Sequence, residues 1–200
     1  MRSKFLLYYI CLVCTLLLGN LTLSGCAVLA VGAVGAAAGT TAAVASDPRS
    51  SGTVINDNAV ENKLRMTFTS TNYPNSNIYV NCYNGVVLLS GQVATAKQKK
   101  QAEFDARTIP NVKQIYNYLA IRLPQSFLSS STDSYTTTQI KTKILGLQDV
   151  HSNDVKIITT NGVVYIFGIV TRKEAQEVAN AAASINGVRK VITLFEYVSS

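Results

Sequence analysis

The chain has 200 residues, of which 18 are lysine or arginine, 11 are aspartate or glutamate and one is histidine, giving a formal net charge of +7. A single histidine, His151, excludes a metal site built from two histidines. The few acidic residues do not form a catalytic pair, because Glu103 and Asp105 point to different sides of a helix and Glu174 belongs to a helix cap. We therefore expect a non-enzymatic protein without a cofactor, whose basic surface binds an anionic partner.

The N-terminus has the pattern of a secretory signal. A short basic start, Met1 to Lys4, precedes an apolar run from Phe5 to Leu18 and then Leu23-Ser24-Gly25-Cys26. These last four residues resemble the bacterial lipobox, which implies cleavage after residue 25 and a diacylglycerol and an N-acyl chain, such as palmitate, on Cys26. We expect residues 1–25 to be a lipoprotein signal peptide and Cys26 to be the lipidation site. The alternative is an uncleaved membrane anchor with an incidental cysteine.

The positions of the cysteines are consistent with an exported protein. Cys11 and Cys14 lie in the predicted signal peptide, so Cys82 is the only free thiol expected in the mature chain, which excludes an intramolecular disulfide. Loss of the signal peptide removes two positive charges and leaves a net charge of about +5. An exported basic protein meets anionic lipid rather than nucleic acid.

Residues 26–53 are rich in alanine and glycine and are predicted to form a lipidated tether. A membrane-embedded helix is the alternative, but glycines and threonines make its insertion weak. Ala27 stands where lipoproteins kept in the inner membrane commonly have aspartate. The lipoprotein resemblance therefore implies the outer membrane, with the chain anchored on its periplasmic face.

One sequence motif occurs twice, as "YNGVVLLSGQV" from Tyr83 and as "TNGVVYIFGIV" from Thr160. Asn-Gly between alternating apolar residues predicts a type I′ turn. The alternation predicts the inward-facing residues, which are Ile78, Val80, Cys82, Val87, Leu89 and Val93 in the first copy and Val155, Ile157, Thr159, Val164, Ile166 and Val170 in the second. Gly91 and Gly168 lie in the strands and predict close approach of another backbone.

Helices flank each hairpin. Val60, Leu64 and Phe68 recur at helical spacing before the first hairpin, and Ile140, Ile144 and Leu147 recur before the second. After each hairpin a capping sequence opens a second helix, Thr95 with Gln98 and Thr171 with Glu174. Third strands are predicted at residues 112–121 and 188–198. The fold class is therefore α+β, with two αββαβ domains at residues 54–123 and 135–200 and a serine-rich linker at 124–134.

The αββαβ unit with "NGVVxLxG" in its hairpin resembles the BON domain. Each domain is then expected to be a small three-stranded sheet packed by two helices. The order of lipobox, tether and two such units resembles dual-BON outer-membrane lipoproteins. That resemblance implies binding of anionic phospholipid through the first helix of the second domain, in support of outer-membrane integrity.

The candidate lipid-binding residues are Tyr135, Thr138, Lys141, Thr142, Lys143 and Leu145. The resemblance places Tyr135 and Leu145 at lipid-facing positions, with Tyr135 in place of a tryptophan. A shift of 80 residues makes Ile55 and Arg65 their counterparts in the first copy, on a largely polar face. The alternative is that Tyr135 and Leu145 pack against the other domain or the linker.

Both faces of the second hairpin are apolar, because Tyr165, Phe167 and Ile169 alternate with the inward residues. We expect the first domain to cover this second apolar face; a partner protein is the alternative. The alternative function is accordingly a periplasmic scaffold or chaperone-like module that binds other proteins. A reactive pair of Cys82 and His151 is not expected, because Cys82 faces inward and His151 lies in a turn.

Overall fold

The computed structural model describes residues 47–123, 128–148, 150 and 153–198. The predicted signal peptide, Cys26 and the tether up to residue 46 lie outside these residues, as does His151. The described residues belong to one compact unit, Ala43–Ser200. Within this described part, no helix combines the length and apolar character needed to cross a membrane.

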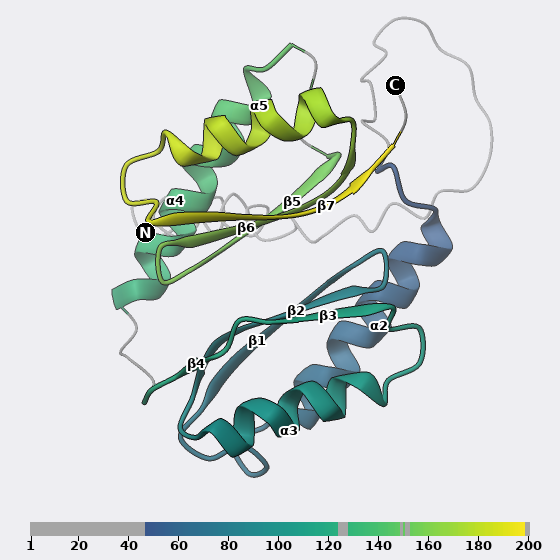
Figure 1. Ribbon diagram of the computed structural model, residues 1–200, viewed down its shortest axis with the longest axis vertical. Coiled ribbons are helices and arrows are strands. Elements are labelled where there is room, and N and C mark those ends of the chain that lie inside the picture. Colours follow the sequence, from purple (N-terminus) through teal and green to yellow (C-terminus); the bar gives the residue numbers. More distant parts are fainter. Residues whose placement is uncertain (1–46, 124–127, 149, 151–152, 199–200) are drawn as a thin grey trace, which may run out of the picture. The chain divides into compact units, whose positions relative to one another are not determined.

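The described elements form two successive αββαβ domains (Figure 1). The first contains α2 (Ser51–Thr67), β1 (Asn77–Tyr83), β2 (Val86–Val93), α3 (Ala96–Arg107), β3 (Gln114–Asn117) and β4 (Ala120–Ile121). The second contains α4 (Leu128–Leu145), β5 (Val155–Thr160), β6 (Val163–Val170), α5 (Arg172–Ala183) and β7 (Lys190–Tyr197). The predicted α+β class and element order are confirmed.

Each sheet combines an antiparallel hairpin with a parallel third strand. β1 pairs with β2 and β5 pairs with β6 in antiparallel register, while β3 and β4 pair with β2, and β7 with β6, in parallel. The parallel strands require a crossover, which α3 and α5 supply. In each domain both helices therefore cover one face of the sheet (Figure 1).

The predicted type I′ turns are present in both hairpins. Asn84 and Gly85 have φ values of 50° and 78°, and Asn161 and Gly162 have values of 52° and 71°. Two successive positive φ angles define this turn, and they suit asparagine followed by glycine. The repeated sequence motif therefore forms the turn and the second strand of each hairpin.

The third strand of the first domain is divided, in contrast to the prediction of one strand over residues 112–121. Tyr118 and Leu119 separate β3 from β4. The Asn117 side chain accepts a hydrogen bond from the Leu119 N–H at 3.3 Å, and Leu119 is buried in the core. This local contact interrupts the strand, whereas β7 runs without a break to Tyr197.

The two cores contain the predicted inward residues except Thr159, which is half-buried outside the second core, and Ile78, which packs partly buried against the first. In the first domain, Val60, Leu64, Val80, Cys82, Val87, Leu89 and Val93 pack with Ala102 and Ala106 of α3. In the second, Ile140, Ile144, Val155, Ile157, Val164, Ile166 and Val170 pack with Ala175, Val178, Ala181 and Ala182 of α5. Small alanines let α3 and α5 lie close to their sheets. Each domain thus buries a core of its own within Ala43–Ser200.

Both second helices begin with a reciprocal capping box, as predicted. Thr95 and Thr171 each accept the N3 backbone N–H, and Gln98 and Glu174 reach back to the cap residue. The first helices begin earlier than predicted. Ser50 caps α2, which therefore includes the last residues assigned to the tether, and α4 begins inside the segment assigned to the linker. Serine and threonine are common in linkers, but their hydroxyls can also bond to backbone groups of a helix, which is why composition alone misplaces these two helix starts.

The predicted close approach at the strand glycines occurs against the neighbouring strand of the hairpin. A Cβ at Gly91 would collide with the Asn77 carbonyl oxygen, and Gly91 also has a φ of +108°. A Cβ at Gly168 would lie 2.9 Å from the Asp154 carbonyl oxygen and 3.0 Å from Val155 Cγ1. Both positions therefore exclude a side chain.

We expect Gly168→Val to lower the free energy of unfolding of the second domain by about 1–3 kcal/mol, because backbone must move to admit the side chain. Gly146→Val is the matched control, since a Cβ there meets only the Lys143 carbonyl oxygen at 3.4 Å. Denaturant unfolding of both variants measures the difference. Equal midpoints for Gly168→Val and the unaltered chain would show that the strand accommodates the side chain.

A third apolar cluster, the inter-sheet cluster, contains residues of both domains. It comprises Tyr83, Leu88, Tyr165, Phe167 and Leu194. The rings of Tyr83 and Phe167 stack with centroids 5.9 Å apart, and Tyr118 contacts Tyr165 at 5.3 Å. The second apolar face of the β5–β6 hairpin is thus covered by the first domain, as expected from sequence.

Candidate functional site

The first helix of each domain places a carboxylate against its own Asn-Gly turn. Asp57 accepts hydrogen bonds from the Asn84 and Gly85 N–H groups at 2.7 and 2.8 Å. Asp133 accepts the equivalent bonds from Asn161 and Gly162 at 2.6 and 2.8 Å. These contacts satisfy turn donors that no strand partner reaches. They also make Asp57 and Asp133 structural counterparts.

This correspondence corrects the predicted alignment of the two helices. Asp57 and Asp133 are 76 positions apart, so the shift of 80 is wrong by one helical turn. Leu145 therefore corresponds to Thr69, beyond the end of α2, and Tyr135 corresponds to Ala59.

The outer face of α2 is also less polar than predicted. Ile55 is 67% exposed and Met66 is 76% exposed, so the first helix of the first domain carries apolar side chains of its own. Exposed apolar residues alone do not distinguish the two helices. The two helices differ in the charges and polar groups around these side chains.

The predicted outward residues of α4 are exposed. Tyr135 and Leu145 are 65% and 67% exposed, whereas Ile140 and Ile144 on the opposite side are fully buried. Thr138, Lys141, Thr142 and Lys143 are also exposed. The alternative that Tyr135 and Leu145 pack into another part of the protein does not hold for the described residues.

Local hydrogen bonds make the exposed surface of this face less polar than its threonine content suggests. Thr138 donates its hydroxyl to the Ser134 carbonyl at 3.0 Å, and Thr142 donates to the Thr138 carbonyl at 3.0 Å. A threonine bonded in this way uses its hydroxyl inside the helix and leaves its methyl group accessible. The outward side of α4 therefore combines a tyrosine, a leucine and two threonine methyl groups.

The lysines of α4 differ from the cations of α2. Arg65 on α2 forms an ion pair with Glu61 at 3.0 Å. Lys143 instead donates to the Ser184 hydroxyl at 2.5 Å, which turns it toward the end of α5. Neither Lys141 nor Lys143 has a carboxylate partner in the described part of the chain. Their charges are available to an external anion, with Lys143 at the edge of the face and not at its centre.

Comparison with known proteins identifies the repeated unit. The sequence model of the BON domain matches residues 56–122 and 132–199. The chain belongs to the BON-domain family. It is 39% identical over 185 residues to outer membrane lipoprotein DolP of Haemophilus influenzae, covering 91% of this chain and 94% of DolP.

Two further likenesses are weaker. The 21 kDa hemolysin of Actinobacillus pleuropneumoniae is 34% identical over 154 residues, covering 76% of this chain and 79% of the hemolysin. A solved structure of CdsD, a structural protein of the type III secretion system of Chlamydia trachomatis, covers 74% of this chain and 93% of that chain, with 14% identity and a TM-score of 0.30.

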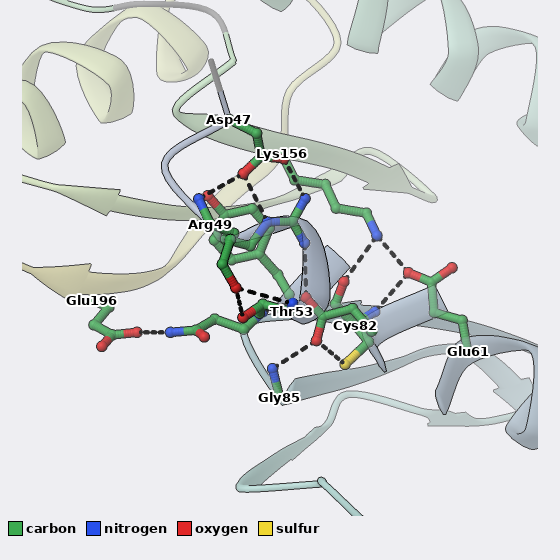
Figure 2. Close-up of polar contacts among 12 residues, drawn as sticks. Asp47, Arg49, Thr53, Glu61, Cys82, Gly85, Lys156 and Glu196 are labelled. Carbon is green, nitrogen blue, oxygen red and sulfur yellow. Dashed lines mark hydrogen bonds and ion pairs between the residues drawn. The ribbon is translucent and has the colours of Figure 1, made fainter. Parts of the chain in front are cut away.

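The first BON domain contains a charged network that sequence reasoning missed (Figure 2). Arg49 donates to Asp57 at 2.8 Å and to Asp47 at 2.7 Å, and its guanidinium lies 4.0 Å from the centre of the Tyr83 ring. Residues 47 and 49 lie in the segment that the sequence predicts to be the tether. The signal that could have revealed this network is the pair of aspartates, Asp57 and Asp133, which precede the two Asn-Gly turns at nearly equal distances.

Polar contacts also join the two BON domains. Lys156 of β5 donates to the Glu61 carboxylate at 2.5 Å and to the Cys82 carbonyl at 3.0 Å (Figure 2). Asn84 donates to Glu196 at 2.5 Å. These bonds border the inter-sheet cluster. Lys156 is therefore a second cation, beside Arg65, for the largely buried Glu61 carboxylate.

Cys82 lies in the core of the first domain. Burial raises the pKa of its thiol to about 12, and the neighbouring Asp57 carboxylate, 3.3 Å from Sγ, acts in the same direction. The thiol therefore stays protonated at neutral pH and is a poor nucleophile. Among the residues that the structure describes, no three metal-ligating side chains lie close enough together to hold an ion.

Proposed function

We propose that this BON protein is a non-enzymatic outer-membrane lipoprotein, anchored through lipids on Cys26 at the periplasmic face, that binds anionic phospholipid through the outward face of α4. Its role is to support the integrity of the outer membrane. The observation that carries the proposal is the exposure of Tyr135 and Leu145 beside two lysines that have no carboxylate partner among the described residues. Similarity to DolP over nearly the whole chain supports the location and the anchor.

The apolar part of the contact comes from two side chains. Partial burial of Tyr135 and Leu145 in the membrane interface contributes on the order of 1–2 kcal/mol each. Tyrosine suits this position because its ring is apolar while its hydroxyl stays among the headgroups. The threonine methyl groups between them extend the apolar surface. This part of the interaction is insensitive to moderate salt.

The electrostatic part comes from Lys141 and Lys143. Each contributes roughly 1 kcal/mol near an anionic surface at low ionic strength. This attraction weakens as salt screens it. The total corresponds to weak, reversible binding. It is sufficient for a domain whose covalent lipid already holds it close to the membrane.

A protein-binding function is favoured by one other surface. Phe104 on α3 is 62% exposed, and Lys97 and Lys100 lie on the same helical stripe without a carboxylate partner in the described ranges. Such a surface suits a scaffold that holds a partner with acidic and apolar groups. Lipid binding by α4 and protein binding by α3 involve different elements, so both functions fit the fold.

Vesicle flotation tests the proposed function. Residues 43–200, which contain both cores, are mixed with vesicles of phosphatidylcholine alone or with added phosphatidylglycerol. We expect the fraction of protein that floats to rise with phosphatidylglycerol and to decrease only partly in moderate salt. Flotation that does not change with the phosphatidylglycerol content would exclude binding of anionic phospholipid. Flotation that disappears completely in moderate salt would exclude insertion of the apolar side chains of α4.

A further inference from the structure

A pocket of about 330 Å³ lies beside the exposed face of α4. It is lined by Arg122, Arg189, Thr132, Thr136 and Asp133, together with the second Asn-Gly turn. The two guanidinium groups supply several hydrogen-bond donors. The pocket therefore offers the groups that bind a phosphate.

The one acidic group in this pocket is already engaged. Both oxygens of Asp133 accept backbone N–H groups of the turn, at 2.6 and 2.8 Å. Arg189 donates to the Asn161 carbonyl oxygen instead of to a carboxylate. Neither Arg122 nor Arg189 forms an ion pair with any described residue. The positive charges of the pocket are thus not cancelled internally.

The equivalent aspartate of the first domain already has a cation as its partner. There Arg49 forms an ion pair with Asp57 at 2.8 Å, and only 10% of its side chain is accessible. The correspondence of 76 positions puts Val60 where the second domain has Thr136, and Lys113 where it has Arg189. The first copy therefore pairs its aspartate with an arginine, whereas the pocket beside the second turn contains two arginines without a carboxylate partner among the described residues, Arg122 from the end of the first domain and Arg189.

The pocket is close to the proposed membrane contact. At about 100° per residue, Thr132 and Tyr135 lie roughly 60° apart around α4. A lipid molecule that touches the Tyr135 ring with its apolar part can therefore place its headgroup between Arg122 and Arg189. The phosphate oxygens then accept bidentate bonds from guanidinium groups, as planar donor pairs favour.

We propose that this pocket binds the phosphodiester group of an anionic phospholipid headgroup. This inference rests on the proposed function, because it specifies which part of the lipid the same surface recognises. The volume exceeds that of a phosphate ion, so the glycerol of a phosphatidylglycerol headgroup is accommodated with it. Arg122 and Arg189 are then determinants of headgroup preference, while Tyr135 and Leu145 supply insertion.

Amide NMR spectra of residues 43–200, titrated with glycerophosphoglycerol, test the pocket without any membrane. We expect shifts at the Gly162 and Gly187 amides. Their counterparts in the first domain, Gly85 and Asn111, should not move. Replacing both arginines, Arg122→Gln with Arg189→Gln, should weaken binding by about tenfold or more, because charged hydrogen bonds are lost. Lys113→Gln is the matched control and should leave the affinity unchanged.

A parallel titration with inorganic phosphate separates a lipid headgroup from a free ion. Several-fold tighter binding of glycerophosphoglycerol supports the headgroup assignment. Equal or tighter binding of inorganic phosphate would overturn it, and so would unchanged Gly162 and Gly187 amides. The Leu145→Glu variant should keep these shifts even where it loses flotation, so failure of the insertion face and failure of the pocket are distinguished.

Discussion

Leu145→Glu is expected to reduce flotation of residues 43–200 with anionic vesicles by at least about tenfold in affinity, because it removes an inserting side chain and adds a repelled charge. The domain should stay folded, since Leu145 is 67% exposed at the last residue of α4. Flotation with phosphatidylglycerol vesicles measures the loss. Circular dichroism confirms that the fold is retained.

The matched control is Ile55→Glu on α2. Ile55 is exposed to the same fraction, 67%, and the substitution makes the same change of charge. We expect it to weaken flotation only slightly. Similar losses from the two variants would assign binding to general electrostatics, and a loss from Ile55→Glu alone would move the contact to α2.

Replacement of the lipidation site should have the largest effect in cells. Cys26→Ser removes the thiol at the lipidation position that would carry the diacylglycerol, so the contribution of about 0.8 kcal/mol from each acyl CH₂ to anchoring is lost. The protein is expected to leave the outer-membrane fraction after a high-salt wash. Membrane fractionation measures this, with Cys82→Ser as the control that keeps the anchor. Cys26→Ser protein that stays with outer membranes would exclude lipid anchoring.

Much of the fold follows from the sequence because its signals are local. Three such signals are the Asn-Gly turns, the alternation of Val87 and Leu89, and the Thr171 cap. Each depends only on residues a few positions apart in the sequence. The division of the third strand of the first domain into β3 and β4 could not be predicted from the sequence. It depends on Leu119 entering a core whose shape is set by distant residues.

The candidate site was predicted less completely. Helical periodicity correctly placed Tyr135 and Leu145 outside and Ile140 inside. It could not align the two copies, because the alignment depends on which carboxylate reaches the turn. Nor could it find the roles of Arg49 and Lys156, whose partners are buried groups brought together only by the tertiary structure.

Spin-labelled lipid provides the most direct measurement of the α4 contact. Residues 43–200 are bound to phosphatidylglycerol nanodiscs with a nitroxide in the upper acyl chain, and amide signals are compared with the label oxidised and reduced. We expect strong broadening at Tyr135, Thr142 and Leu145, and little at Ile55 and Met66. Broadening confined to α2, or absent from α4, would contradict membrane binding through α4.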